Sequence, residues 1–349
     1  MANRSKTSMM IGVATICIAC VLPCVTQGGS LTIPDIQYTE SADGASLYNG
    51  KIVDCSGGIV IAKTGGGRPR LFLQDPNALD GWGAIQVKGW VSDAFASVNV
   101  GDWAEMQQTF VEEYRGTTFL QYWDKNPDGS QPVLRVVSRD HNLPQPLVID
   151  VNEIRAPEYL PLEDAWIVAD HRAERLESML LQIRDVAVVE RDLGKAQDNY
   201  ELQSFREPND TGALCWASDY ANQNRQKADL YVPGIEAGRR FRAVTGVLEQ
   251  YTNLGEGFDY YQLLTLSEES VVGLCSADLD QDGDVDLWDS KLLMEQLLVS
   301  SSPPVGDMNH DGEVDSTDLD LFNAAWQQAD VNGDGIVNGD DLDIQGDRT

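Results

Sequence analysis

Short apolar runs, separated by Gly, Asp, Asn and Pro, dominate the chain between about residues 36 and 273. The runs are rich in Val, Ile, Leu and aromatic residues, and few are long enough for a helix, which is typical of β-strands joined by turns. The first set of strand patterns lies at 57–62, 70–75, 83–87, from 100 onward, and at 113–120. The second set lies at 178–190, 199–204, 213–217, 237–249 and 260–264. Two successive five-stranded units fit this pattern, which predicts a mainly β body.

Three short motifs in these strands resemble motifs of a known fold. They are Phe72-Leu73-Gln74-Asp75, Val100-Gly101-Asp102 and Val244-Thr245-Gly246-Val247-Leu248-Glu249. This resembles the tandem OB-fold modules attached to bacterial extracellular nucleases and related phosphoesterases. The resemblance concerns scaffold strands, and it implies that the body consists of two OB-like barrels. OB barrels commonly bind oligonucleotides or oligosaccharides on one sheet face, so a binding role follows by analogy of fold.

The segment after residue 276 has a different pattern, in which acidic and amide side chains surround a glycine at fixed offsets, three times. The first copy is Asp278, Asp280, Asp282, Gly283, Asp284, Val285, Asp286 and Asp289. The second copy is Asp307, Asn309, Asp311, Gly312, Glu313, Val314, Asp315 and Asp318. The third copy is Asp330, Asn332, Asp334, Gly335, Ile336, Val337, Asn338 and Asp341.

These offsets are those of an EF-hand-type loop. Ca²⁺ takes about six to eight hard oxygen ligands, and positions 1, 3, 5, 9 and 12 of the loop supply side chains. Position 7 supplies a backbone carbonyl, here from Asp284, Glu313 and Ile336, and glycine at position 6 permits the sharp turn. The sequence therefore predicts Ca²⁺ as the cofactor, bound in three loops. The valines at position 8 are expected to be buried and to pair two loops through a short β-bridge.

Helical periodicity follows the first two loops. The apolar positions are Leu292, Leu293, Leu297 and Leu298 after the first loop, and Leu319, Leu321, Phe322 and Trp326 after the second. A short amphipathic helix is therefore expected after each of these loops, and no comparable helix precedes each loop. The stretch 300–304 lengthens the interval between loops one and two, so loops two and three, which are closer in sequence, are the expected pair.

The loop-then-helix arrangement resembles a type I dockerin, the calcium module by which secreted polysaccharide-degrading enzymes attach to cohesin domains. In that family, positions 10 and 11 of each loop help to choose the cohesin. Here those positions are Leu287-Trp288, Ser316-Thr317 and Gly339-Asp340. The resemblance implies a cohesin-type protein partner. Dockerins usually have two repeats and this chain has three, so an intramolecular clamp against the neighbouring domain is the alternative.

Charge and the N-terminal pattern set the expected compartment and domain organisation. The formal net charge is −31, and about half of the excess follows residue 275, so the protein attracts multivalent cations and nucleic acid is the less favoured partner. Arg4 and Lys6 precede an apolar run that is shorter than a membrane span, as in an export signal, although a lipid anchor remains open. The expected domains are a signal peptide at 1–28, barrels at 29–157 and 158–273, and a dockerin-like domain at 274–349.

The sequence contains no pattern that identifies a catalytic centre. HExxH, GxSxG and phosphate-binding glycine loops are all absent from the sequence, so the protein is expected to be non-catalytic. A glycoside hydrolase with an unrecognised carboxylate pair remains an alternative, because Asp and Glu are abundant. Aromatic residues in the first barrel would suit sugar rings, and with a dockerin-like tail this favours polysaccharide as ligand. An accessory nucleic-acid-binding protein of an extracellular nuclease system is the other alternative.

Overall fold

The structure is a computed structural model that describes residues 29–65, 68–90, 92–154, 158–160, 162, 165–167, 171–191, 199–205, 215–218, 237–253, 258–265, 270–298, 306–309, 311, 313–338 and 341. The predicted signal peptide, residues 1–28, lies outside the described residues, as do Gly339 and Asp340. Within the described residues, no helix is both long and apolar enough to cross a membrane.

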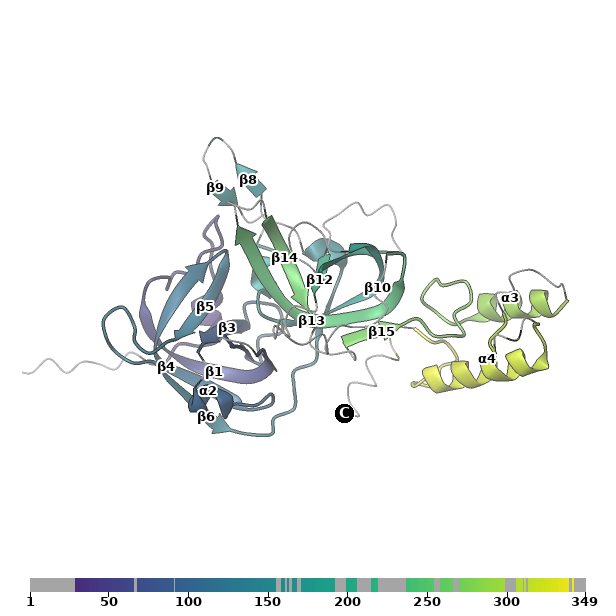
Figure 1. Cartoon of the computed structure of the whole chain (residues 1–349), viewed down its shortest axis with the longest axis horizontal. Helices are drawn as coiled ribbons and strands as arrows, with labels where there is room; N and C mark the ends of the chain where they lie inside the picture. Colours follow the sequence, from purple (N-terminus) through teal and green to yellow (C-terminus); the bar gives the residue numbers. More distant parts are fainter. Residues whose placement is uncertain are drawn as a thin grey trace, which may run out of the picture.

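The first barrel is a closed sheet of five strands, β1 (Ile52–Lys63), β2 (Arg70–Gln74), β3 (Ala84–Gly89), β4 (Trp103–Tyr114) and β5 (Thr117–Tyr122). The strand order is β1-β2-β3-β5-β4, and pairing of β1 with β4 closes the barrel (Figure 1). Strands β3 and β5 run parallel and the other pairs are antiparallel. This closed five-stranded order is that of the OB fold.

The β4–β5 hairpin shows how the sequence fixes this topology locally. Tyr114 and Thr117 are paired across the hairpin, so only Arg115 and Gly116 form its turn. Both turn residues have positive φ angles, 58° and 82°. A two-residue turn of this kind matches the right-handed twist of its strands, and glycine favours it because it has no Cβ. The hairpin turn predicted within 113–120 is confirmed.

The second barrel repeats the order of the first. Its strands are β10 (Leu180–Arg191), β11 (Asn199–Ser204), β12 (Cys215–Ser218), β13 (Arg240–Asn253) and β14 (Phe258–Leu264). The order is β10-β11-β12-β14-β13, with β13 pairing back to β10 and β12 parallel to β14. The prediction of a mainly β fold with two OB-like barrels is confirmed.

Smaller elements surround the two barrels. The strands outside the barrels are β6 (Val133–Ser138), β7 (Leu147–Ile149), β8 (Glu158–Leu160), β9 (Ala165–Ile167) and β15 (Val271–Gly273). The short helices are α1 (Ile33–Gln37) and α2 (Asp93–Ala96), with the 3-10 turns η1 (Val151–Glu153) and η2 (Glu174–Leu176). Strand β7 lies in the predicted range 29–157 but pairs with β10 of the second sheet. The domain boundaries themselves stay predictions.

The two barrels pack directly against each other through the outer side of β2 and β3. An apolar cluster joins Phe72 of β2 to Leu180, Val247 and Leu264 of the second barrel. Beside it, Arg70 pairs with Glu249 of β13. Because all five residues of β2 are buried, the second barrel covers this face of the first.

The C-terminal module follows β15 and is helical. It contains α3 (Leu287–Leu298) and α4 (Ser316–Ala329), which confirms the helices expected after loops one and two. Figure 1 shows the two helices side by side at the end of the molecule beyond β15. Leu293 of α3 and Phe322 of α4 are completely buried in the module's own apolar cluster. The module therefore has a small core that is separate from the barrels.

Candidate calcium-binding and docking site

Loops one and two are each continuous with the helix that follows them. In loop two, Asp315 at position 9 is the N-cap of α4, and its carboxylate accepts a hydrogen bond from the Thr317 N–H at 2.7 Å. Asp318 at position 12 completes a capping box by accepting from the Asp315 N–H at 2.8 Å. Capping boxes stabilise helix starts because they satisfy N–H groups that lack intrahelical partners. Predicted ligand positions 9 and 12 thus also fix the start of α4.

The carboxylate at position 12 organises its own loop. In loop one, Asp289 Oδ1 accepts hydrogen bonds from the N–H groups of Leu279 at 2.6 Å and Asp280 at 3.2 Å. Its Oδ2 accepts from the Asp286 N–H at 2.8 Å. The side chain is 1% exposed. One buried carboxylate therefore joins positions 2, 3 and 9 of the loop.

Loops two and three repeat this arrangement closely. The position-12 residues Asp318 and Asp341 are both 0% exposed. Each accepts three backbone N–H groups, at 2.7, 3.2 and 2.8 Å, from positions 2, 3 and 9 of its own loop: Met308, Asn309 and Asp315, and Val331, Asn332 and Asn338. The threefold repetition of position 12 in the sequence therefore corresponds to the same geometry three times.

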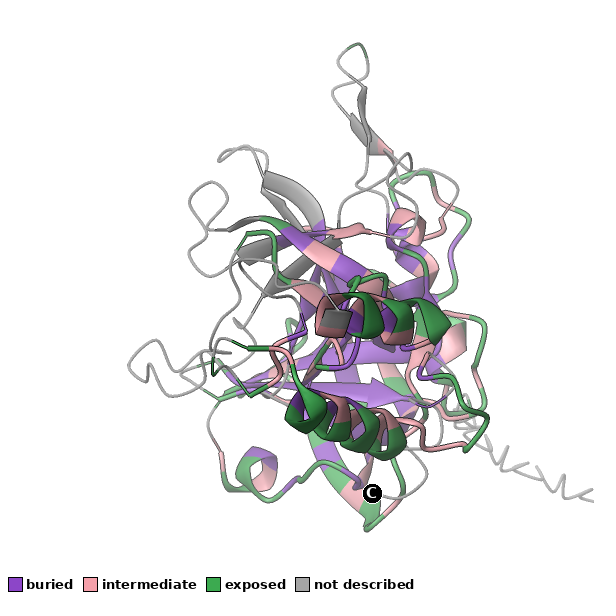
Figure 2. Ribbon diagram, turned by 90° about the vertical axis from the view of Figure 1, so that its right-hand side faces the viewer, coloured by how far each residue is buried: buried purple, intermediate pink, exposed green. Residues whose placement is uncertain are grey.

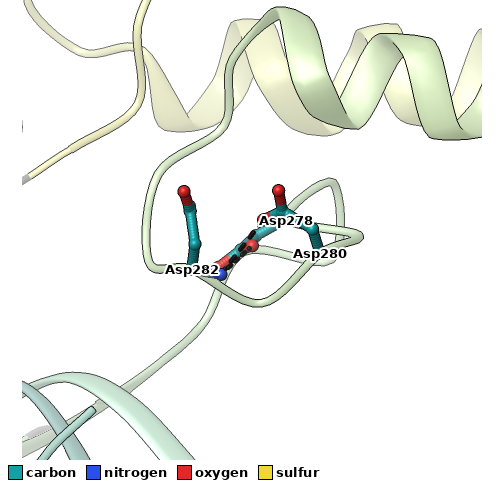
Figure 3. A group of neighbouring side chains, drawn as sticks. All are labelled: Asp278, Asp280 and Asp282. Atoms are coloured by element: carbon teal, nitrogen blue, oxygen red, sulfur yellow. Dashed lines mark hydrogen bonds between the residues drawn. The ribbon is translucent and has the colours of Figure 1, made fainter. Parts of the chain in front are cut away.

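Positions 1, 3 and 5 bring carboxylates together in loop one. One oxygen from each of Asp278, Asp280 and Asp282 lies within 4.8 Å of the others, which is close enough to share one ion. Figure 3 shows the three side chains gathered at the turn of the loop. Gly283 at position 6 has a φ of 99° and donates its N–H to Asp278 Oδ2 at 3.1 Å. Hard carboxylate oxygens at this spacing are the donors that Ca²⁺ prefers.

Burial and neighbouring negative charges disfavour the ionised form of the carboxyl groups in loop one. Burial raises the pKa of Asp278 to about 7, and the nearby charge of Asp289 acts in the same direction. Burial also raises the pKa of Asp280 and Asp289. A divalent cation among these oxygens would replace the lost hydration and offset their mutual repulsion. The donor set therefore fits a hard divalent ion.

Loop two differs in its charge balance. Burial acts to raise the pKa of Asp318, but backbone hydrogen bonds from Asp315, Asn309 and Met308 outweigh it and lower the pKa. Loops two and three carry asparagine at position 3, where loop one carries Asp280. The three loops share the contacts of position 12 and differ in charge.

Loops one and three form the bridged pair. Val285 N–H donates to Val337 O at 2.9 Å and Val337 N–H donates to Val285 O at 3.3 Å. Both valines are buried, as predicted for position 8, whereas Val314 of loop two is only partly buried. The prediction that loops two and three pair was wrong for this bridge. Because α4 returns alongside α3, the loop before α3 and the loop after α4 meet at the same end.

The residues predicted to contact a partner are exposed where the structure describes them. Leu287 and Trp288 at the start of α3 are 80% and 61% exposed, and Lys291 Nζ lies 4.8 Å from the Trp288 ring centroid. Ser316 and Thr317 at the start of α4 are also exposed. Figure 2 shows the outward faces of both helices as largely exposed. The described positions 10 and 11 are therefore accessible to a partner.

The outer face of β2 and β3 in the first barrel contacts the second barrel. OB folds commonly bind ligands on the face of strands 2 and 3. Here Arg70 is paired with Glu249, and Gln86 of β3 donates to the same Glu249 carboxylate at 3.2 Å. The Leu180 N–H donates to Gln74 Oε1 at 3.0 Å. The second barrel therefore covers these side chains of β2 and β3, so this part of the first barrel is not open to a ligand.

Two buried glutamates, Glu174 and Glu177, and the partly buried Glu113 lie near the contact between the barrels and carry no motif that sequence reasoning could recognise. Burial raises the pKa of Glu113 to about 7 and that of Glu174 to about 8, and it raises the pKa of Glu177 well above its usual value. Glu174 accepts a hydrogen bond from the Tyr261 hydroxyl at 2.8 Å. Glu177 Oε2 accepts from the Thr118 N–H at 3.4 Å.

Comparison with protein families finds a match in the C-terminal module. A loop followed by one helix, repeated around a shared core, is a calcium-loop module of EF-hand type without the entering helix. Residues 276–325 match the family described as Dockerin type I domain. The match spans loops one and two, α3 and most of α4, and it ends before loop three. The chain therefore carries a dockerin type I domain in this segment, and dockerins of this type bind calcium in general.

Other comparisons add little about the barrels. No curated protein matches the chain. Among solved structures, the OB domain of a Methanosarcina mazei protein is 16% identical, covering 27% of this chain and 79% of that one, with a TM-score of 0.20. A replication protein A heterotrimer bound to ssDNA and fission yeast Pot1 with ssDNA are 10% and 11% identical. Each of these two matches covers 61% of this chain. They cover 49% of the replication protein A chain and 78% of the Pot1 chain, with TM-scores of 0.22 and 0.20. The OB assignment rests on the strand order.

Proposed function

We propose that this protein is an exported, non-catalytic docking protein whose C-terminal module binds Ca²⁺ and then a cohesin-type partner. The observation that carries the proposal is the threefold geometry of position 12, in which a buried aspartate accepts N–H groups from positions 2, 3 and 9 of its loop. This arrangement holds each loop in a curved form, and in loop one the oxygens of Asp278, Asp280 and Asp282 lie within 4.8 Å of one another. The family match over residues 276–325 supports the same reading.

The proposed ligands are those of the three loops. Side-chain oxygens come from positions 1, 3, 5, 9 and 12, and position 7 supplies its carbonyl. Ca²⁺ supplies the positive charge that lets several carboxylates lie together in a small volume. The chain's own groups order the loop, cap the helix and bury position 12. Calcium and the fold of the module are therefore expected to stabilise each other.

Partner recognition is assigned to the exposed apolar start of α3. Leu287 and Trp288 cannot be explained by the module's own core, because both side chains are largely exposed. Such side chains are typical anchors of protein interfaces. Because α3 begins inside loop one, calcium would fix the orientation of this pair. The dockerin resemblance points to a cohesin-type domain as the partner.

The barrels are proposed to be the body that the module attaches, with polysaccharide as the ligand class. Trp90 and Tyr114 are 44% and 49% exposed on the first barrel and suit stacking on sugar rings. Nucleic acid is the less favoured ligand, since Arg70 is neutralised by Glu249. Single-strand binding that weakens steeply with salt would favour the nucleic-acid alternative. Release of reducing sugar from polysaccharide, lost on mutating one acid, would favour a hydrolase.

Calcium titration of the purified protein tests the proposal. Isothermal titration calorimetry should show saturable binding, and a cohesin domain on a biosensor should capture the protein with Ca²⁺ and release it with EGTA. Asp311→Asn at position 5 of loop two should weaken calcium binding. Glu313→Gln at position 7 removes a carboxylate from the same loop but keeps the ligating carbonyl, so it is the matched control. Absence of calcium uptake by the wild type would refute the proposal.

A further inference from the structure

Loop three contacts both loop one and helix α4. It lies beyond the segment that matches the family, which ends at residue 325. It is bridged to loop one through Val285 and Val337, and Trp326 Nε1 of α4 donates to Gly335 O at 3.2 Å. Loop two lies between α3 and α4, away from this bridge. The pairing therefore places the additional loop at the end of the module that faces the body.

The connection between the body and the module is short. Strand β15 ends at Gly273 and the first predicted ligand is Asp278. Strand β15 pairs with β13, with Phe241 opposite Gly273. The loops therefore start next to this part of β13, and no long linker separates them.

Two arginines on β13 contact the loops. Arg240 and Arg242 lie two residues apart on β13, on either side of Phe241. Arg240 Nη1 donates to the carbonyl of Gln281 in loop one. Arg242 Nη2 donates to the carbonyl of Asn338 in loop three. The second barrel thus contacts both loops of the bridged pair.

Arg242 is the central group of this contact. Its side chain is 8% exposed, and its guanidinium lies 4.0 Å from the carboxylate of Asp341, which is 1% exposed. Burial lowers the pKa of Arg242, and Asp341 opposes that effect. A buried guanidinium is tolerated only where acceptors and an opposite charge compensate its lost hydration. Loop three supplies both kinds of partner.

The same residues connect Arg242 to the predicted calcium site. Asp341 is position 12, and Asn338 is position 9, whose main-chain carbonyl is not a ligand in the pattern. This carbonyl accepts from the Asp341 N–H at 3.3 Å and also from Arg242. The aspartates at positions 1, 5 and 12 of loop three carry three negative charges. One Ca²⁺ and one guanidinium would balance them. Groups that orient metal ligands from outside commonly alter metal affinity by about 10- to 100-fold.

We propose that loop three is a calcium-dependent joint that fixes the C-terminal module to the second barrel through Arg242. The proposal rests on calcium binding as proposed above. The joint leaves loop two and the exposed start of α3 for the external partner, and holds the partner-binding surface in one orientation relative to the barrels. By linkage, docking on Arg242 and calcium at loop three strengthen each other equally.

The test uses the full protein, with one variant on the barrel side of the contact and one in loop three. Arg242→Gln removes the barrel's contact, and Asp334→Asn weakens loop three without altering the barrel. Arg239→Gln is the matched control, because Arg239 is exposed and adjacent to Arg240. The substitution removes one positive charge, as Arg242→Gln does. Small-angle scattering and hydrogen exchange are measured with Ca²⁺ and with EGTA, and calorimetry measures calcium affinity.

In Ca²⁺ the wild type and Arg239→Gln should give the same compact scattering curve. Arg242→Gln and Asp334→Asn should lengthen the maximum dimension, and exchange in loop three should accelerate at least about tenfold. Arg242→Gln should weaken the calcium site of loop three roughly tenfold and spare loop two. A wild type that takes up no calcium would overturn the proposed function. Normal uptake with unchanged scattering and exchange in both variants would overturn the joint alone.

Discussion

Val285 of loop one and Val337 of loop three exchange two backbone hydrogen bonds, at 2.9 and 3.3 Å, although 52 positions separate them in the sequence. Their side chains are 1% and 0% exposed, so the bridge lies in the core of the module. Ordering one of these loops therefore places the backbone of the other.

The bridge predicts coupling between the proposed calcium sites of loops one and three. Asp334→Asn should weaken binding at loop one by roughly fivefold, although Asp334 is in loop three, because a less ordered loop three supports Val285 less well. Asp311→Asn at the same position of loop two should leave loop one nearly unchanged. Calorimetry, with the amide signal of Gly283 reporting loop one by nuclear magnetic resonance, checks this. Equal effects of both variants on loop one would contradict the pairing.

Position 12 should not tolerate asparagine. In Asp318→Asn one carboxylate oxygen becomes an NH₂ group. This group faces a backbone N–H but cannot accept a hydrogen bond from it. The loss of a charge-assisted acceptor should destabilise the module by about 2 kcal/mol and reduce calcium affinity at loop two. Asp320→Asn makes the same chemical change on the exposed side of α4 and is the control. Circular dichroism and calcium titration measure both; similar behaviour of the two variants would count against the role of position 12.

Partner binding should depend on Trp288 without affecting the fold. Its side chain is 61% exposed, so Trp288→Ala should leave calcium affinity and thermal unfolding unchanged. Capture by a cohesin-type domain should weaken by at least about 2 kcal/mol if the ring is an anchor of the interface. Met294→Ala, which shortens another exposed side chain of α3, is the control, since Met294 is 52% exposed. Unchanged capture by Trp288→Ala would move the interface elsewhere.

The stability of the barrels should fall as pH rises from about 5 to about 7.5. Burial raises the pKa of Glu174 from 4.5 to about 8, so the folded state holds a proton that the unfolded state has released. This contribution to the free energy of unfolding is fully present below pH 4.5 and disappears as pH passes 8. Lys88, whose pKa burial lowers to about 8, acts mainly above this window.

Glu174→Gln tests this pH dependence, because the amide stays neutral and its oxygen can still accept from the Tyr261 hydroxyl. The variant should be more stable than the wild type at pH 8, by an amount on the order of 2 kcal/mol, and should show a flatter stability profile. Glu40→Gln, at an exposed carboxyl, is the control. Urea unfolding at several pH values measures the effect. A wild type that gains stability across this window would contradict the prediction.

The contact between the barrels should be sensitive to one ion pair. Glu249→Gln leaves the Arg70 guanidinium buried without its counter-charge, which should reduce the free energy of unfolding by about 3 kcal/mol. Glu105→Gln removes a carboxylate whose partner Arg135 is 60% exposed, and it should have an effect below about 1 kcal/mol. Urea unfolding compares the two variants. Equal losses would show that Arg70 and Glu249 are not the dominant polar contact between the barrels.

The sequence by itself determined the strands of the two barrels, the helices after loops one and two, and the spacing of the candidate ligands within each loop. A loop of this type spans about twelve residues, and its contacts, such as Asp318 with Met308 and Asp315, stay within it. The alternation of apolar residues and the Arg115–Gly116 turn are equally local. Local patterns of this kind can be recognised without knowing where the rest of the chain lies.

Only the tertiary structure decided which distant residues contact each other and which surfaces remain exposed. Arg70 and Glu249 are 179 positions apart and Arg242 and Asn338 are 96 apart, so no spacing in the sequence predicts that they meet. From the sequence, Arg240 and Arg242 carry no predicted role, and the ligand-binding sheet face of the barrels is not identified. Packing placed the arginines against loops one and three and covered the β2–β3 face of the first barrel with the second barrel, because contacts between distant elements depend on how whole elements pack.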